Sequence, residues 1–178
     1  MTRRRWRSVA AAGGLALIVA ACTPAPTTVL TSLRESDCTL PAPDVQEQFA
    51  SSELGVQQCG EVQGWQVLLV SSDTNSWIEL RSPDGKWSSE NVVVYEQPIG
   101  LFPGVATAQP LEWRVDPDRG PTALLFTVNA QDSRDGETRI SRVFVARFEG
   151  DRVCLIGREG TIDLARTLAA GPTACPAS

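Results

Sequence analysis

The chain has 178 residues, of which 16 are basic and 21 acidic, and it contains no histidine. Four of the 16 basic residues lie within the first seven positions, so 12 basic and 21 acidic residues remain after them, a net charge of −9. This acidity argues against nucleic-acid binding, and the lack of histidine excludes Ser-His-Asp catalysis, Cys-His catalysis and histidine metal sites.

The first 22 residues predict an export signal. The four arginines within positions 3–7 precede an uncharged apolar run at 9–20, which is too short to cross a bilayer as a helix. The small residues Ala20 and Ala21, directly before Cys22, resemble the lipobox of bacterial lipoproteins. The resemblance implies that a signal peptide, residues 1–21, is removed and that the thiol of Cys22 carries acyl chains such as palmitate.

Acylation of Cys22 predicts a protein that is anchored to a membrane without spanning it. The expected location is the cell envelope, either the periplasmic face of the outer membrane or the outer face of the cytoplasmic membrane. An ordinary secretory signal, which would leave Cys22 as a free thiol, is the alternative. The segment 2–6 also resembles a twin-arginine motif, so the export route stays open.

Residues 22–37 predict a lipidated tether, because Pro24, Pro26 and several Thr and Ser residues leave little to bury. Residues 38–178 are then expected to form one disulfide-containing, β-rich domain. Near its start, Asp44 favours the beginning of a short helix that places Val45 and Phe49 on one face.

Four further cysteines, an even number in an exported chain, predict two disulfides. They are Cys38, Cys59, Cys154 and Cys175. Three pairings are conceivable, and the local one, Cys38 with Cys59 and Cys154 with Cys175, is favoured because each pair brackets a compact unit. A four-thiolate zinc site is disfavoured because no C-x2-C pair occurs.

Apolar and alternating segments separated by polar turns predict consecutive antiparallel strands. The expected strands are 65–71, 77–81, 92–95, 111–115, 123–129, 140–148 and 153–157. Turns are predicted at 82–85, 116–121 and 134–136, and a Pro- and Gly-rich loop at 98–110.

The last element differs in kind from the strands. Thr161 is placed to cap a helix with one apolar stripe, which Gly171 and Pro172 end. The predicted fold class is therefore α+β: a single domain, mainly an antiparallel sheet of about six or seven strands, with a C-terminal helix.

No segment specifies a reaction, and no cofactor or metal is predicted. The strand carboxylates Glu79, Glu90, Glu96 and Glu112 are mostly expected to be solvated charges, although two of them close together could serve a glycosidase. The segment 116–120 lacks the later ligands of a calcium loop and is expected to be a turn.

Two tryptophans are candidates for a ligand platform. Trp77 falls on the strand face opposite Ile78 and Leu80, and Trp87 follows a turn, so both are expected to be exposed. The alternative for both rings is packing in the core or on a sheet face.

Several short motifs resemble a family of uncharacterised secreted proteins found widely in proteobacteria. They are Cys59-Gly60, Gly64-Trp65, residues 111–114, the strand 123–126, Cys154, and the helix at 164–166 before Cys175. The chain departs from that pattern after Cys59, where 60–62 replaces a Pro-Gly-aromatic step. The resemblance implies a disulfide-bearing single domain and carries over no activity.

The sequence thus favours a lipid-anchored envelope protein with a non-catalytic binding or scaffolding domain. Its partners would be the membrane, through the anchor, and an envelope protein or glycan. The alternatives are a peptidoglycan- or glycan-binding module and an inhibitor of a hydrolase such as lysozyme, since small acidic proteins can block cationic enzymes.

Overall fold

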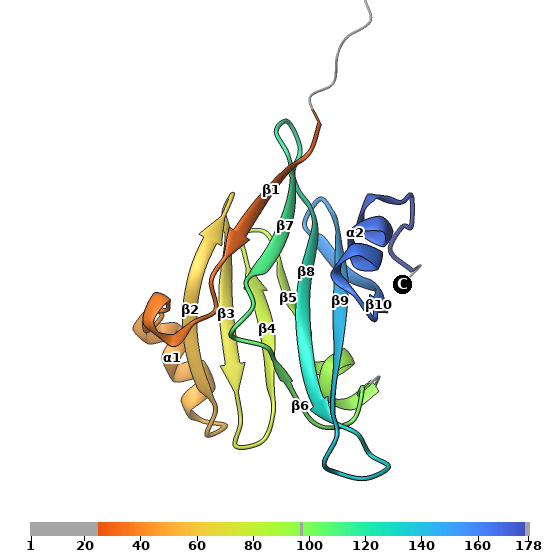
Figure 1. Ribbon diagram of the computed structural model, residues 1–178. Coiled ribbons are helices and arrows are strands. Elements are labelled where there is room, and N and C mark those ends of the chain that lie inside the picture. The colour runs from red at the N-terminus through yellow and green to blue at the C-terminus, as the bar shows by residue number, and fades with distance from the viewer. Residues whose placement is uncertain (1–24, 97, 177–178) are drawn as a thin grey trace, which may run out of the picture.

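The computed structural model describes residues 25–96 and 98–176. Their strands form two antiparallel sheets, one of six strands and one of four, which stack face to face (Figure 1). The predicted class, mainly antiparallel β with a C-terminal helix, is confirmed. The strands of these residues number ten, where about six or seven were expected.

The six-stranded sheet has the order β1-β7-β8-β9-β10, with β6 also paired to β8. Its strands are β1 (Thr27–Thr31), β6 (Leu101–Val105), β7 (Leu111–Asp116), β8 (Gly120–Gln131), β9 (Arg139–Glu149) and β10 (Arg152–Glu159). The four-stranded sheet is a meander of β2 (Gly55–Val62), β3 (Trp65–Ser71), β4 (Ser76–Arg81) and β5 (Lys86–Ser88). The helices are η1 (Glu35–Asp37), α1 (Pro43–Ala50), η2 (Asn91–Glu96) and α2 (Ile162–Ala170).

The main core lies between the two sheets. Alternate residues of each strand point inward, so Ile78 and Leu80 of β4 meet Trp113 of β7 and Phe126 of β8 in one buried cluster. The ring of Trp65 packs edge-on against Phe148 with centroids 5.3 Å apart, which joins the two sheets near one end.

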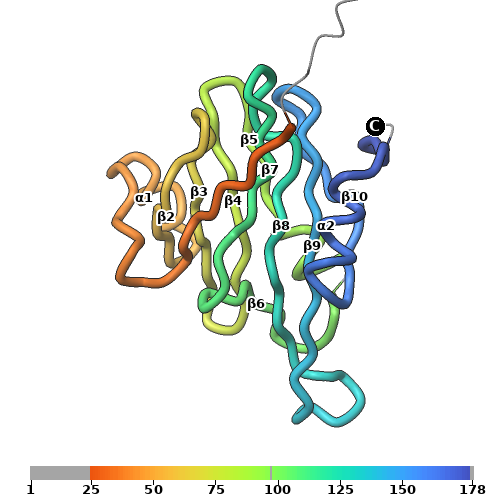
Figure 2. The backbone as a smooth tube through the Cα atoms, turned by 45° about the horizontal axis from the view of Figure 1, so that its top comes forward, coloured from red at the N-terminus to blue at the C-terminus, as the bar shows by residue number. Residues whose placement is uncertain are grey.

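The two α-helices each cover the outer face of one sheet (Figure 2). Val45 and Phe49 of α1 pack on Trp77 and its neighbours in the four-stranded sheet. Ala165 and Ala169 of α2 pack on the six-stranded sheet, where small alanines allow close approach. The domain therefore has four layers, in the order helix, sheet, sheet, helix.

Residues assigned to a tether belong to this domain. Thr27–Thr31 is the strand β1, paired with β7, and the Thr31 hydroxyl accepts a hydrogen bond of 3.1 Å from the Trp113 indole N–H. Leu33, a few residues later, is 1% exposed. The predicted boundary between residues 37 and 38 is therefore wrong for residues 27–37, because long-range pairing with β7 orders a segment that looks polar in isolation.

Two other segments differ from expectation where the chain crosses between the sheets. Residues 92–95, expected as a strand, lie in the π-helical η2, where the Val93 N–H donates to the Ser89 carbonyl at 2.9 Å. The Ser89 hydroxyl accepts a hydrogen bond from the Ile78 N–H. This backbone group of β4 is therefore not available to β5, and the pairing of β4 with β5 ends at Ser88. The expected loop 98–110 contains the strand β6, which pairs with β8.

Removal of the largest apolar anchor of α1 should loosen this helix. Phe49 is 8% exposed and also carries the Arg81 guanidinium 5.4 Å from its ring centroid. Phe49→Ala should lower the free energy of unfolding by about 3 kcal/mol. Urea unfolding of the oxidised protein measures it. The exposed neighbour Glu47, replaced by Ala, is the control, and an equal effect of both changes would contradict the packing.

Low pH should destabilise the β8–β9 hairpin by protonating the Asp132 carboxylate. Hydrogen bonds from Arg134 lower the pKa of Asp132 from 3.8 to about 2. Because the folded pKa lies below the ordinary value, this stabilisation is complete above about pH 4 and is lost as the pH falls toward 2. Asp132→Asn should therefore be less stable than the wild type at pH 6, and the gap should shrink toward pH 2. Denaturant unfolding across this range measures it, and a pH-independent gap would refute the assignment.

Candidate functional site

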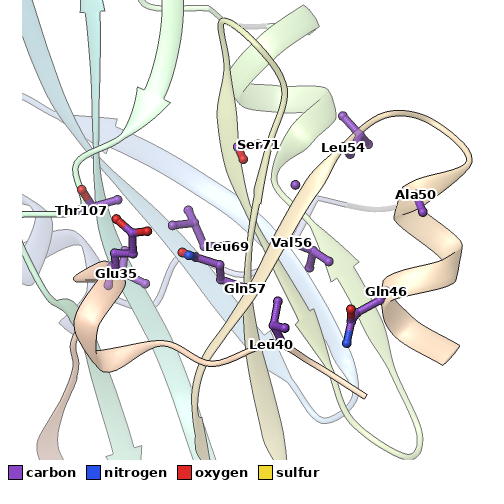
Figure 3. A pocket seen from close by; sticks show the side chains of 12 residues that line it. Glu35, Leu40, Gln46, Ala50, Leu54, Val56, Gln57, Leu69, Ser71 and Thr107 are labelled. Atoms are coloured by element: carbon purple, nitrogen blue, oxygen red, sulfur yellow. The ribbon is translucent and has the colours of Figure 1, made fainter. Parts of the chain in front are cut away.

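A groove of about 600 Å³ lies along the edge strand β2. Figure 3 shows Gln46, Ala50 and Leu54, from α1 and the turn after it, on one side of β2. Glu35 and Thr107 lie on the other side, where the chain leaves the six-stranded sheet. An edge of sheet backbone thus forms the floor between two walls.

The chain itself covers only part of this edge. Thr39 and Gln58 exchange two backbone hydrogen bonds of 2.8 Å, so Thr39 acts as one residue of an extra antiparallel strand beside β2. Pro41 has no N–H to continue this pairing, and the chain turns away into α1. The pairing of this segment with β2 therefore ends at Thr39.

The backbone of Val56 is left facing the groove. Backbone groups along a strand point alternately to its two sides, so Val56 faces the same way as Gln58, which is two residues further on and bonds outward to Thr39. Gln57 between them pairs with Leu69 of β3 instead. The N–H and C=O of Val56 are consequently a ready pairing site for another extended chain.

The groove walls are apolar or uncharged, with one exception. Leu33, Leu40, Leu54 and Leu69 contribute apolar surface, and Leu40 is 75% exposed. The Gln46 amide is held in place by donating to the Pro41 carbonyl at 2.7 Å. Glu35 is the one charged side chain among the lining residues. This chemistry suits a polypeptide better than a phosphorylated or strongly acidic ligand.

Neither predicted tryptophan forms an exposed platform. Trp77 is 3% exposed because α1 covers its face of the sheet, so the expectation of exposure is wrong. Trp87 is half-buried and packs edge-on against Phe126, with ring centroids 6.3 Å apart. The single-strand pattern placed Trp77 on the correct face but could not show that a helix lies over it.

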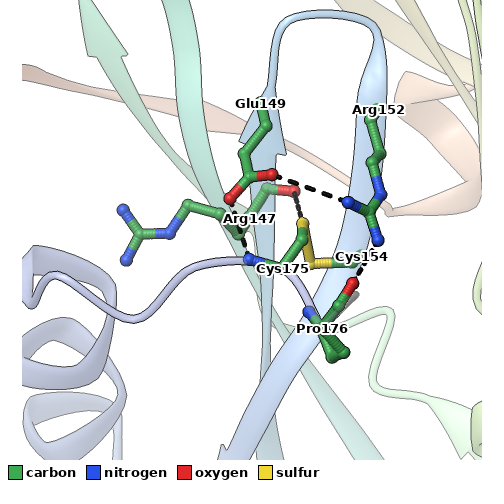
Figure 4. The surroundings of a disulfide bond; sticks show 6 residues. All are labelled: Arg147, Glu149, Arg152, Cys154, Cys175 and Pro176. Carbon is green, nitrogen blue, oxygen red and sulfur yellow. Dashed lines mark hydrogen bonds and ion pairs between the residues drawn. A yellow bond between two sulfur atoms is a disulfide. The ribbon is translucent and has the colours of Figure 1, made fainter. Parts of the chain in front are cut away.

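Both predicted disulfides are present with the local pairing. Cys38 is the neighbour of Thr39 and Cys59 lies in β2, so the first bond fastens the covering segment beside the groove. The second bond joins Cys175, after α2, to Cys154 in β10 (Figure 4). There the Cys175 N–H donates to the Glu149 carboxylate at 2.8 Å.

The two buried strand carboxylates, Glu79 and Glu112, do not lie close together. Glu79 is 4% exposed and lies 2.6 Å from Arg81, while Glu112 is 5% exposed and lies 2.7 Å from Arg166. They point to the outer faces of different sheets, so the whole sandwich separates them. Glu90 and Glu96 are less buried: Glu90 precedes η2, and Glu96, its last residue, accepts a hydrogen bond from Asn91.

The remaining candidates from the sequence can be compared with the described residues. Asp116 accepts hydrogen bonds from the N–H groups of Asp118 and Arg119, so this segment is the predicted turn. In residues 25–96 and 98–176 no group of three or more potential ligands is placed to hold a metal. None of the helices in that part is long and apolar enough to span a membrane. Cys22, the predicted lipidation residue, lies outside it.

Comparisons with known proteins add no relative. No protein-family model, no curated protein and no solved structure matches the chain. The resemblance to secreted proteobacterial proteins therefore stays an expectation from short motifs.

Sequence reasoning did not identify the groove, because one of its walls comes from the segment assigned to the tether. Leu33 and Glu35 lie there, and both line the cavity. A signal was present in 27–31, where three threonines and a valine are typical of a strand. Nothing local could show that this strand adds to β7, at residues 111–115 of the chain.

Proposed function

We propose that this protein is a lipid-anchored envelope protein that binds an extended segment of a partner protein in the groove along β2. The observation that carries this proposal is the outward-facing backbone of Val56, which lies on the floor of the β2 groove. Strand addition of this kind gains affinity from main-chain hydrogen bonds and specificity from alternate side-chain pockets.

The chain provides a template for the bound segment. The Thr39–Gln58 pair sets an antiparallel direction, and a partner strand that takes the next outward position would pair with Val56. Its side chains would alternate between the wall formed by Ala50 and Leu54 and the side that carries Glu35. The expected ligand is therefore an extended peptide with apolar residues toward α1 and a neutral or basic residue toward Glu35.

A binding role without catalysis is favoured by the state of the buried carboxylates. Glu79 is paired with Arg81 and Glu112 with Arg166, so both carboxylates serve as structural ion-pair partners in this proposal. The glycan-binding alternative loses its main support, since Trp77 offers no stacking face.

The anchor part of the proposal is supported by the position of the first strand. β1 begins at Thr27, and Pro26 is four residues after Cys22. Four residues reach at most about 14 Å, so an acylated Cys22 would hold this end of the sandwich close to the membrane surface. Two disulfides are in keeping with an oxidising compartment outside the cytoplasm.

The groove is tested by deleting one backbone N–H. Proline is tolerated on an edge strand where its N–H would face outward, so Val56→Pro should keep the fold and remove the pairing donor. Decapeptides selected by phage display on the full-length protein in neutral detergent micelles should bind this variant at least about tenfold more weakly. Fluorescence polarisation of the labelled peptides measures the affinity.

Val56→Thr is the matched control, because it keeps the N–H and the branched shape of the side chain. Its affinity should stay within about threefold of the wild type. Leu40→Glu should weaken binding through the groove wall instead. Equal affinity of the Val56→Pro and Val56→Thr proteins, or no peptide enrichment at all, would reject the groove as the binding site.

The anchor is tested by the intact mass of the protein from the membrane fraction of its host. A chain that begins at acylated Cys22, with all four remaining cysteines oxidised, is expected. Blocking lipoprotein signal processing should convert it to the precursor mass. An unacylated soluble chain would overturn the anchor and leave the peptide groove as a separate question.

A further inference from the structure

A second cavity, of about 520 Å³, lies on the outer face of the six-stranded sheet. Pro26, at the start of the domain, forms one side, and Pro172 to Ala174, after α2, form another. Its floor contains Arg114 of β7 and Arg147 of β9, which both lie in register with Ala123 of β8 between them. The side chains of Arg114 and Arg147 therefore lie on either side of the Ala123 methyl group, on strands about 10 Å apart.

Among the residues that the structure describes, no acidic side chain forms an ion pair with either of these two arginines. Arg147 donates one bond to the Gly171 carbonyl at 2.8 Å, while its buried Nε–H has no acceptor in the part of the chain that the structure describes. The Arg114 guanidinium likewise makes no hydrogen bond or ion pair with any described residue. A buried guanidinium N–H without an acceptor is costly, so the cavity favours a ligand that supplies one.

The acidic groups nearby are already engaged. Glu149 lines the same cavity, but its carboxylate accepts the Cys175 N–H at 2.8 Å and lies 3.9 Å from Arg152 (Figure 4). Arg119 is also a lining residue and is paired with Asp116 at 2.7 Å. Two uncompensated positive charges thus stand in a protein that is acidic as a whole.

We propose that this cavity binds the phosphate group of a phospholipid or a free oxyanion of the same chemistry, held between Arg114 and Arg147. Guanidinium groups match phosphate oxygens in geometry and form strong charge-assisted hydrogen bonds with them. The oxyanion would supply the acceptor that the Nε–H of Arg147 lacks.

Pro26 favours the membrane as the source of the phosphate. It lines the cavity and stands four residues after Cys22, so an acylated Cys22 would bring lipid headgroups within reach. The choice of source rests on the proposed anchor, whereas the oxyanion chemistry of the site does not. The Cys154–Cys175 bond gives the cavity its second wall, because it ties the segment after α2 to β10 beside Arg147.

The site is tested by nuclear magnetic resonance of the full-length, isotope-labelled protein in neutral detergent micelles. Dihexanoyl phosphatidylglycerol and inorganic phosphate are titrated separately at constant ionic strength. The lipid should shift the Arg147 Nε–H and the Ala123 amide signals saturably. Arg114→Gln should weaken this binding at least about tenfold and leave the fold intact, because the Arg114 guanidinium forms no hydrogen bond or ion pair with a described residue.

Arg142→Gln is the control, since it removes the same charge from an exposed part of β9 outside the cavity. Shifts with inorganic phosphate but not with the lipid would support the site and assign it to a free anion. No saturable shift with either probe, or equal weakening by both substitutions, would overturn it. The intact-mass measurement reports on the anchor independently, so failure of the anchor and failure of this site can be told apart.

Discussion

The pairing of β1 with β7 is the contact on which the arrangement of this molecule depends. It brings residues 27–31 into the six-stranded sheet, and the Trp113 indole, fully buried, donates to Thr31 at its end. Since β1 begins at Thr27, the start of the domain lies beside the β7–β8 turn. Since Thr31 is followed by the buried Leu33, the next residues become a wall of the β2 groove. One strand pairing thus places both candidate sites.

The sequence predicted what local chemistry controls. The two local disulfides follow from where the cysteines stand in the chain. The turn after Asp116 follows from its carboxylate, which accepts the Asp118 N–H. Helix α2 begins after Thr161, whose hydroxyl accepts the Leu164 N–H. Structure that depends on contacts between distant segments could not be predicted from the local sequence. Residues 92–95 are rich in valine, yet they form η2 because the chain must pass there from one sheet to the other. Trp77 looks exposed on its own strand and is buried because α1 packs over that face of the sheet.

The charged residues that looked like solvated strand positions prove to fasten the outer layers. Arg81 bonds Glu79, reaches Gln48 of α1 at 2.9 Å and lies over the Phe49 ring. On the outer face of the other sheet, two nitrogen atoms of Arg166 in α2 donate hydrogen bonds to the Glu112 carboxylate of β7. A buried ion pair adds little net stability over apolar packing, but it requires both partners in one place. The Arg166–Glu112 pair therefore helps to fix α2 beside the arginine cavity, while Arg81, held by Glu79 in the same strand, helps to fix α1 beside the groove through Gln48 and Phe49.

The two cavities lie toward opposite ends of the sandwich. Pro26 and the arginines adjoin the β7–β8 turn, whereas Gly55 and Ser71, which flank the β2 groove, lie at the far ends of β2 and β3 from their connecting turn. That turn contains Gln63, whose side chain comes close to Gly120 of the β7–β8 turn. A domain held at the arginine end would consequently direct its open strand edge away from the membrane. Because short edges, bulges and covering segments normally block strand addition, an edge left open within a groove and facing outward is better explained by a partner than by chance.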